Sequence, residues 1–121
     1  MFNQDKPIYL QIADRICEQI LAGTFADDER IPSVRETAAA LQVNANTTVK
    51  AYDELSRDNI IYNRRGMGFY VTPGARKHIM EQRRTLFVER TLTQIFHDME
   101  LLDLRIDDIV ELYHRQNTPK A

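Results

Sequence analysis

The segment Ile31–Leu55 constrains the fold more than any other part of this chain, because it predicts two short helices joined by a tight link. Ser33 follows Pro32 and precedes Glu36 by three residues, which is the spacing of a capping box at a helix N-terminus. Farther along, Asn44 offers a second N-cap, because its side-chain oxygen can accept a hydrogen bond from a free backbone N–H. Two helices separated by so short a turn predict a helix-turn-helix.

The second predicted helix divides its side chains between a core and an open face. Thr48, Tyr52 and Leu55 recur at helical spacing, so we expect them to point toward the core. Polar side chains near the start of this helix that fall on its other faces include Asn46, Thr47 and Lys50. A helix that opens with small polar donors and acceptors is typical of the DNA-reading helix of a helix-turn-helix.

The length and composition bound the class of protein. A chain of 121 residues suits one domain, or one small domain with an appendage. Hydrophobic residues at 43% and charged residues at 28% are ordinary for a globular protein. The sequence has no apolar run near the roughly 20 residues of a membrane span and no secretory signal pattern at its start. Cys17 is the single cysteine, so no internal disulfide can form, and we expect a cytoplasmic protein.

Charge is distributed unevenly along the chain, although the net charge is only −2. Acidic residues are absent from positions 37–52 and 59–76, whereas three of them are gathered at positions 27–29. The basic residues in the two stretches without acids are Lys50, Arg64, Arg65 and Arg76. This distribution predicts a local positive face on a mildly acidic body, which is compatible with a nucleic-acid partner.

An amphipathic helix is predicted over residues 8–22, before the helix-turn-helix. Its apolar stripe repeats every fourth position and consists of Ile8, Ile12, Ile16 and Ile20. Pro7 suits the first turn of such a helix, and Gly23 suits a left-handed stop after it. Cys17 is interpreted as a packing residue, because nothing near it in the sequence indicates thiol chemistry.

A β-hairpin is predicted after the helix-turn-helix. Residues 59–63 and 69–72 are prone to form strands, and the turn between them contains Gly66 and Gly68, which tolerate positive φ angles. Arg64 and Arg65 are expected at its tip. A hairpin at this place is typical of the wing of a winged helix. The alternative is a solvated hairpin without a binding role, since arginines are common at turns.

Pro73-Gly74 marks the expected boundary between a winged helix-turn-helix domain, residues 1–74, and a helical tail, residues 75–121. The predicted fold is therefore mainly α with a small β-hairpin wing. We expect a helix over residues 75–101, a break around Asp103 and a shorter amphipathic helix after it. The apolar residues expected on the dimerisation face are Leu86, Phe87, Val88, Leu92, Ile95, Phe96, Met99, Ile106, Ile109, Val110 and Tyr113.

A tail of this size cannot build a stable core alone. Its apolar faces must be buried against the winged helix, against a second copy of the chain, or against both. Symmetric dimerisation is favoured over packing within one chain, because a second copy of a winged helix would add a second set of DNA contacts.

The phrases that carry a family resemblance are PIY at 7–9, QIA at 11–13, IPSVRE at 31–36, VNANT at 43–47, KAY at 50–52, Leu55 and GMGFYV at 66–71. In this order and spacing, residues 7–72 strongly resemble the GntR-family winged-helix transcription regulators. Larger members carry a ligand-binding domain or an aminotransferase-like domain that binds pyridoxal phosphate. The short stretch after Gly74 resembles instead the YtrA-type subfamily, whose members dimerise through a two-helix tail.

This resemblance implies a repressor that binds a palindromic operator as a homodimer, and many YtrA-type members repress nearby transporter operons. Arg35, at the start of a helix, is placed to contact a phosphate or to read a guanine edge, and the matching arginine of GntR relatives touches DNA. Ser33 is both a cap and an expected phosphate donor. The residues predicted to bind DNA are Ser33, Arg35, Asn44, Ala45, Asn46, Thr47, Lys50, Arg64, Arg65 and Gly66.

Several of these positions carry alternatives. Asn44 serves either as a cap alone or also as a DNA contact. Ala45 stands where relatives often have proline or a longer polar residue, so one base reader is missing and no relative's operator can be carried over. Thr48 stands where many relatives have valine, and we expect its hydroxyl to bond back to a backbone carbonyl.

Catalysis and cofactor binding find no support in the sequence. His78, His97 and His114 are too far apart along the chain to suggest a local metal site, and the chain lacks a phosphate-binding glycine loop and a nucleophile elbow. The competing hypothesis is a winged helix that docks on another protein without specific DNA binding. A small-molecule effector would have to bind in the dimer interface or between the tail and the winged helix. Alternatively, none binds and the amount of protein sets operator occupancy.

Overall fold

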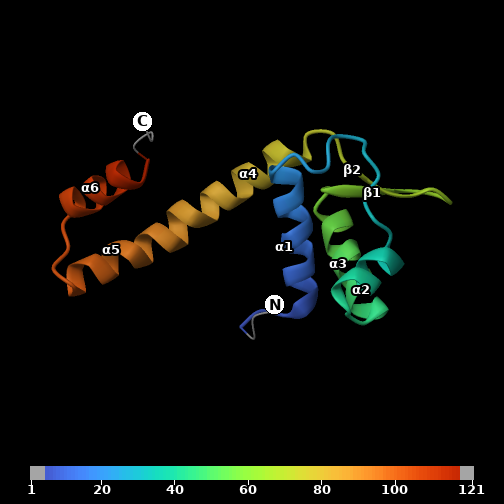
Figure 1. Cartoon of the computed structure of the whole chain (residues 1–121), viewed down its shortest axis with the longest axis horizontal. Coiled ribbons are helices and arrows are strands. Elements are labelled where there is room, and N and C mark those ends of the chain that lie inside the picture. The colour runs from blue at the N-terminus through green and yellow to red at the C-terminus, as the bar shows by residue number, and fades with distance from the viewer. Residues whose placement is uncertain (1–4, 118–121) are drawn as a thin grey trace. The chain divides into compact units, whose positions relative to one another are not determined.

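The structure is a computed structural model that describes residues 5–117. Its elements are α1 (Ile8–Leu21), α2 (Val34–Leu41), α3 (Ala45–Arg57), β1 (Ile61–Arg64), β2 (Gly68–Val71), α4 (Ala75–Leu86), the π-helical segment η1 (Phe87–Thr91), α5 (Leu92–Leu101) and α6 (Ile106–Asn117). The predicted fold, mainly helical with a hairpin wing, is confirmed (Figure 1). The chain divides into two compact units between Gln82 and Arg83.

The core of the first unit forms where α1 packs beside α3 (Figure 1). Ile12, Ile16 and Ile20 are buried in it, as their spacing predicts, and Cys17 is buried beside them. Ile8, the first member of the stripe, is 45% exposed. Ile8 is the first residue of α1, so it lies at the end of the stripe, beyond the buried part of the helix.

The second helix of the helix-turn-helix contributes one face to the same core. Thr48, Tyr52 and Leu55 are almost completely buried, as predicted. The Thr48 hydroxyl donates a hydrogen bond of 3.3 Å to the backbone carbonyl of Asn44, so the expected bond back to the helix is confirmed. Tyr52 packs edge-to-face on Phe69 of the hairpin, with ring centroids 5.1 Å apart, and thereby joins α3 to the wing.

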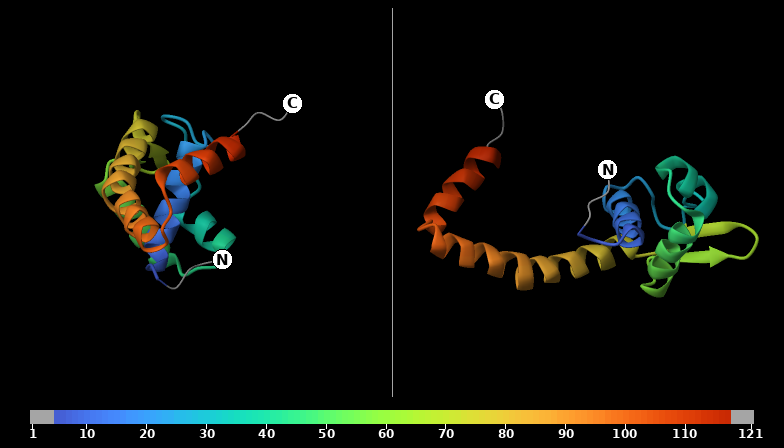
Figure 2. Two further views of the ribbon diagram at one scale, coloured as in Figure 1. Left: turned by 90° about the vertical axis from the view of Figure 1, so that its left-hand side faces the viewer. Right: turned by 90° about the horizontal axis from the view of Figure 1, so that it is seen from below.

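The wing is an antiparallel pair of β1 and β2 in which Ile61 pairs with Val71 and Arg64 with Gly68. The loop before α2 runs along the outer edge of β2. There, the N–H of Asp28 donates to the Val71 carbonyl at 2.8 Å, and the N–H of Ile31 donates to the Phe69 carbonyl at 2.9 Å. These bonds anchor the base of the hairpin, whose turn projects beyond the three helices (Figure 2).

The second unit is helical. The predicted helix over residues 75–101 is present as α4, η1 and α5, with the wider π-helical turns of η1 as an addition that the sequence did not predict. Asp103 has a φ of +53°, which ends the helical run where the break was expected, and α6 follows. Among the described residues of this unit, Met99 alone is buried. The unit therefore has almost no core of its own.

The start of α4 belongs to the first unit. Ala75 and Ile79 are buried and complete the core of the winged helix. For this reason the compact units divide eight residues after the boundary that Gly74 suggests. Within residues 5–117, no helix is both long enough and apolar enough to cross a membrane.

Candidate nucleic-acid interface

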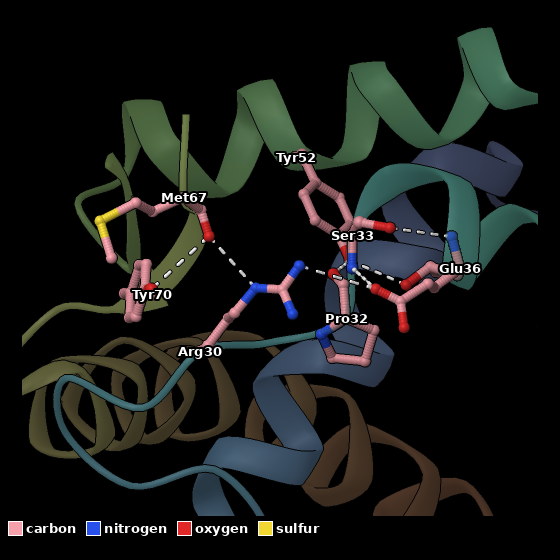
Figure 3. Close-up of polar contacts among 8 residues, drawn as sticks. Arg30, Pro32, Ser33, Glu36, Tyr52, Met67 and Tyr70 are labelled. Carbon is pink, nitrogen blue, oxygen red and sulfur yellow. Dashed lines mark hydrogen bonds and ion pairs between the residues drawn. The ribbon is translucent and has the colours of Figure 1, made fainter. Parts of the chain in front are cut away.

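The N-terminus of α2 is capped as the sequence predicts. The Ser33 hydroxyl accepts a hydrogen bond from the N–H of Glu36 at 3.1 Å, and the Glu36 carboxylate accepts one from the N–H of Ser33, also at 3.1 Å (Figure 3). The bond from the Ser33 backbone, together with the Ser33 side chain and the positive charge of Arg30, lowers the pKa of Glu36. Arg35 follows the cap directly and is exposed in the first turn. Its cationic group is therefore open to a partner.

The N-terminus of α3 is capped by Asn44, whose side-chain oxygen accepts a hydrogen bond of 2.7 Å from the N–H of Asn46. The cap role of Asn44 is thus confirmed, and a DNA contact from it stays a prediction. Ala45, Asn46 and Lys50 are exposed, and Thr47 is half-buried. These residues present small polar groups and one cation around the positive end of a helix dipole, an arrangement that favours an anionic partner.

A buried hydroxyl fixes α2 against α3. The Tyr52 hydroxyl donates to the Pro32 carbonyl at 2.5 Å (Figure 3). It is also 2.8 Å from the Thr37 hydroxyl. Because the single Tyr52 proton points to Pro32, Thr37 donates to the Tyr52 oxygen. Burial of the ring raises the pKa of Tyr52. This network ties the segment before α2, α2 itself and the middle of α3 into one unit.

Two residues of this face were not singled out in the sequence. Val49 lies on α3 between Asn46 and Lys50 and is 42% exposed, so an apolar group stands among the polar ones. Such a group suits the methyl group of a thymine. Tyr9 of α1 places its ring 4.4 Å from the Lys50 ammonium, a cation–π contact that orients this cation. The sequence signal for Tyr9 was its place off the apolar stripe of the first helix.

Arg64 lies at the tip of the wing, as expected: it is the last residue of β1, and its carbonyl accepts the hydrogen bond that closes the turn, from the N–H of Met67 at 2.8 Å. Its side chain points back along the hairpin, which the sequence did not predict. The guanidinium lies 4.4 Å from the Tyr70 ring centroid and donates to the Tyr62 hydroxyl at 3.2 Å. Tyr62 in turn donates to the Asp28 carboxylate at 2.6 Å, and this bond is the main reason why its pKa is raised.

Arg65 and Gly66 occupy the turn itself, where both are exposed. Gly66 has a φ of +76° and open space around the position that a Cβ would take. Of the two predicted wing arginines, Arg65 is thus the one whose side chain is open to a partner. Arg64 is held by Tyr62 and Tyr70, whose rings stack across the two strands.

All the predicted dimerisation residues lie in the second unit, including Leu86 at the end of α4. Met99 is buried, Leu92 and Ile109 are half-buried, and the others are exposed. Further large apolar side chains that are exposed there, and that the prediction did not include, are Leu101, Leu102, Leu104 and Leu112. Within residues 5–117, no group of three or more His, Cys, Asp or Glu side chains is placed to hold a metal ion.

Comparisons with known proteins agree with this geometry. Residues 8–71 match the profile of the family described as "Bacterial regulatory proteins, gntR family". The chain is 35% identical over 105 residues to the transcriptional repressor YtrA of Bacillus subtilis, and the alignment covers 87% of this chain and 80% of YtrA. An alignment of that length extends beyond the winged helix into the helical tail.

Solved structures give the same result. A transcriptional regulator of the GntR family from Bacteroides thetaiotaomicron superposes with a TM-score of 0.75 at 42% identity, covering 91% of this chain and 99% of that one. The DNA-binding domain of AraR, solved with operator ORX1, superposes with a TM-score of 0.56 at 26% identity over 60% of this chain and 93% of that domain. The resemblance inferred from the sequence is confirmed. The chain therefore belongs to the GntR family of bacterial regulatory proteins and is a winged helix-turn-helix transcription regulator.

Proposed function

We propose that this regulator is a repressor that binds a palindromic DNA operator as a homodimer, with one winged helix on each half-site. The observation that carries the proposal is the set of exposed cationic and polar side chains at the N-termini of α2 and α3 and on the wing. The similarity to AraR, whose DNA-binding domain was solved with its operator, supports a DNA partner. The similarity to the repressor YtrA supports repression. We propose a transporter operon as the target, because many members of the YtrA-type subfamily, which the chain resembles, repress such operons.

The first turn of α2 supplies contacts to one edge of the half-site. Arg35 reads a guanine edge through two parallel N–H donors or binds a phosphate. The Ser33 oxygen already accepts from the N–H of Glu36, which leaves the hydroxyl proton free to donate to a phosphate. Ser33 thus caps the helix and binds DNA with different atoms of one group.

The N-terminal part of α3 enters the major groove in this proposal. Asn46 and Thr47 offer donors and acceptors to base edges, and Val49 offers an apolar surface. Lys50, oriented by the ring of Tyr9, neutralises a phosphate. Asn44 and Ala45 line the entry to the groove. Because Ala45 has no polar group, it contributes shape rather than hydrogen bonds.

The wing contacts the backbone of the duplex or its minor groove. Arg65 supplies the charge, and Gly66, which has no Cβ, lets the turn approach the phosphates closely. Arg64 packs on the Tyr70 ring, which stabilises the hairpin, and its charge adds to the positive potential that the wing presents to the DNA. The wing therefore extends the contact beyond the helix-turn-helix.

Dimerisation is assigned to residues 75–121 and DNA binding to residues 1–74. The support for this division is the number of apolar side chains left exposed in the second unit, among them Phe87, Phe96 and Val110. Where many large apolar side chains are exposed on one small unit, protein–protein contact is the usual reason. A twofold partner would cover it and would present equivalent α3 helices to successive major grooves, about 34 Å apart or a multiple of that distance.

The second candidate is a winged helix that docks on another protein. Such a surface is depleted of charge at its centre and enriched in aromatic and apolar groups. The open face of this winged helix instead carries Arg35, Lys50 and Arg65. Its composition favours DNA.

A mobility-shift titration tests the proposal. The purified protein is titrated against the DNA upstream of its own gene at two salt concentrations, with an excess of unrelated DNA as competitor. We expect a salt-sensitive complex that survives the competitor, because specific binding exceeds nonspecific binding by about three orders of magnitude or more. Loss of the complex to any competitor would limit the protein to general DNA affinity. Failure of the folded protein to bind any DNA would favour the docking function.

A further inference from the structure

Arg30 lies in the loop between α1 and α2 and belongs to none of the residues assigned to DNA binding above. It pairs with Tyr70 as an isolated β-bridge at the outer edge of β2. From there its side chain reaches the turn of the wing, where Nε donates a hydrogen bond of 3.2 Å to the Met67 carbonyl (Figure 3). These two residues are 37 positions apart in the sequence.

The other end of the same guanidinium faces α2. Nη2 is 3.9 Å from Oε1 of Glu36, the carboxylate that accepts from the backbone of Ser33 (Figure 3). Arg30 therefore stands between the wing turn, which carries Arg65, and the capped first turn of α2, which carries Arg35. Both of those arginines are exposed.

The backbone of the wing is shaped around this side chain. A Cβ added at Gly68 would lie 3.0 Å from Nε of Arg30 and 3.6 Å from Nη2. Gly68 also has a φ of +103°, which other residues rarely adopt. A side chain at position 68 would therefore press on the guanidinium of Arg30 and displace it by a few tenths of an ångström.

The contacts of Arg30 fix the position of the wing turn more than they add to the stability of the fold. Its ion pair with Glu36 is long, and both side chains are more than half exposed, so the pair alone contributes little. In contrast, the bond from Nε to Met67 has a fixed direction, because the guanidinium is planar. That bond holds the carbonyl at the tip of a hairpin that otherwise projects from the domain.

We propose that Arg30 is a positioning residue that holds the wing turn in a fixed place relative to the start of α2. With Arg30 in place, Arg65 and Arg35 meet their two sites on the DNA at a set separation. Arg30 thus acts through the wing and does not itself touch the operator. This inference rests on the proposed function, operator binding.

A double-mutant cycle on the full chain tests how Arg30 acts. Arg30→Ala, Arg65→Ala and Arg35→Ala are titrated against the operator, singly and with Arg30→Ala added to each of the other two. We expect Arg30→Ala alone to weaken binding about two- to tenfold, the range of one net hydrogen bond. Added to Arg65→Ala it should cost little more, because the wing contact is already lost, whereas added to Arg35→Ala its effect should be retained in full. Equal effects of Arg30→Ala in the wild-type and Arg65→Ala backgrounds would indicate a direct phosphate contact and overturn the proposal.

Gly68→Ala provides an independent variant, with Gly23→Ala as its matched control. Gly23 has a φ of +83° and open space around its missing Cβ, so its substitution strains the backbone without touching Arg30. We expect Gly68→Ala to weaken operator binding as Arg30→Ala does and to add little to it. Gly23→Ala should lower the midpoint of thermal unfolding and leave operator affinity unchanged. Equal losses of affinity in the two glycine variants would contradict the proposal.

A measurement without DNA separates this inference from the proposed function. Amide ¹⁵N relaxation of the free protein reports the order of residues 65–68 on the fast timescale. We expect the order parameters of these residues to fall in Arg30→Ala while those of α3 stay unchanged. If the wild-type protein binds no operator but residues 65–68 lose order in Arg30→Ala, operator binding is wrong as a function, whereas the role of Arg30 in positioning the wing is supported. Unchanged order parameters of residues 65–68 in Arg30→Ala would overturn the positioning role, whether or not the protein binds an operator.

Discussion

Two hydroxyl groups in the core of the winged helix differ in whether their removal would leave other polar groups without a hydrogen-bond partner. Tyr52 donates to the Pro32 carbonyl and accepts from Thr37, so its hydroxyl satisfies two other groups. Thr48 donates to the Asn44 carbonyl, which already accepts from the N–H of Thr48. Removing a partner from a buried polar group costs much more than removing a redundant donor.

Tyr52→Phe is expected to lower the free energy of unfolding by about 1–3 kcal/mol, because the Pro32 carbonyl and the Thr37 hydroxyl lose their hydrogen-bond partner. Urea denaturation followed by circular dichroism measures the change. The double variant with Thr37→Val should recover part of the loss, since it removes one of the two orphaned groups. A Tyr52→Phe variant as stable as the wild type would show that water replaces the hydroxyl.

Thr48→Val is expected to leave the free energy of unfolding unchanged or to raise it by up to about 1 kcal/mol. The Asn44 carbonyl keeps its bond from the Thr48 backbone, and a buried methyl group replaces a buried hydroxyl. The same urea titration tests this expectation. A loss of more than about 1 kcal/mol would mean that the side-chain bond carries stability of its own.

Arg35→Ala is expected to weaken operator binding by about 1–3 kcal/mol and to relax the preference for one base if Arg35 reads a guanine. Arg57→Ala is the matched control, because it removes an equal charge at the C-terminal end of α3, where Arg57 pairs with Glu54. Operator titrations of both folded variants give the comparison. Equal small losses in both would indicate that Arg35 contributes only general charge.

At the scale of elements, the capping box makes the stability of α2 depend on pH. Hydrogen bonds from Ser33 lower the pKa of Glu36 in the folded state, so the ionised carboxylate favours folding. This contribution is fully present above the pKa that Glu36 has in the unfolded chain, about 4.3, and it is lost as the pH falls through the lower folded value.

Glu36→Gln removes the ionisation and keeps a side chain that can close a capping box. We therefore expect the stability of the wild type to fall more steeply than that of the variant as the pH drops below about 4.3. Thermal unfolding between about pH 3 and pH 6 measures both profiles. Parallel profiles would mean that other carboxylates set the acid sensitivity.

At the scale of the whole molecule, the two units differ in how they bury apolar side chains. The first unit encloses a continuous core from α1 to the start of α4, whereas the described part of the second unit buries Met99 alone. A helical unit without a core gains stability by covering its apolar faces with a partner. In the proposed function that partner is a second copy.

Phe96→Glu is expected to shift the protein toward the monomer and to weaken operator binding, because a charge would have to be buried in the dimer interface. His97→Glu places the same side chain at the next residue of α5, at a position that is also exposed but polar, and should leave both properties unchanged. Sedimentation velocity over a range of protein concentrations measures the mass, and the mobility shift measures binding. A Phe96→Glu variant that remains dimeric would exclude this residue from the interface.

The features predicted correctly from the sequence depend on neighbours within a few residues. The capping box of Ser33 and Glu36 and the N-cap of Asn44 follow from spacings of two or three positions, and they form with distances of 2.7–3.1 Å. Similarly, Gly66 has its positive φ because a tight turn between two strands requires it. Caps and turns depend on residues that are close together in the sequence. The helices, the strands and the sequence motifs of the family could therefore be recognised without coordinates.

The features that only the tertiary structure decided depend on contacts between distant segments. Arg30 meets Met67, Tyr9 meets Lys50, and Arg64 turns back toward Tyr70 and away from the tip. No periodicity or motif indicates such pairs, because each requires the packing of separate elements before the side chains come within reach. The sequence by itself therefore determined the winged helix-turn-helix and its residues. The packed fold decided which of its cations are held and which are open to a partner.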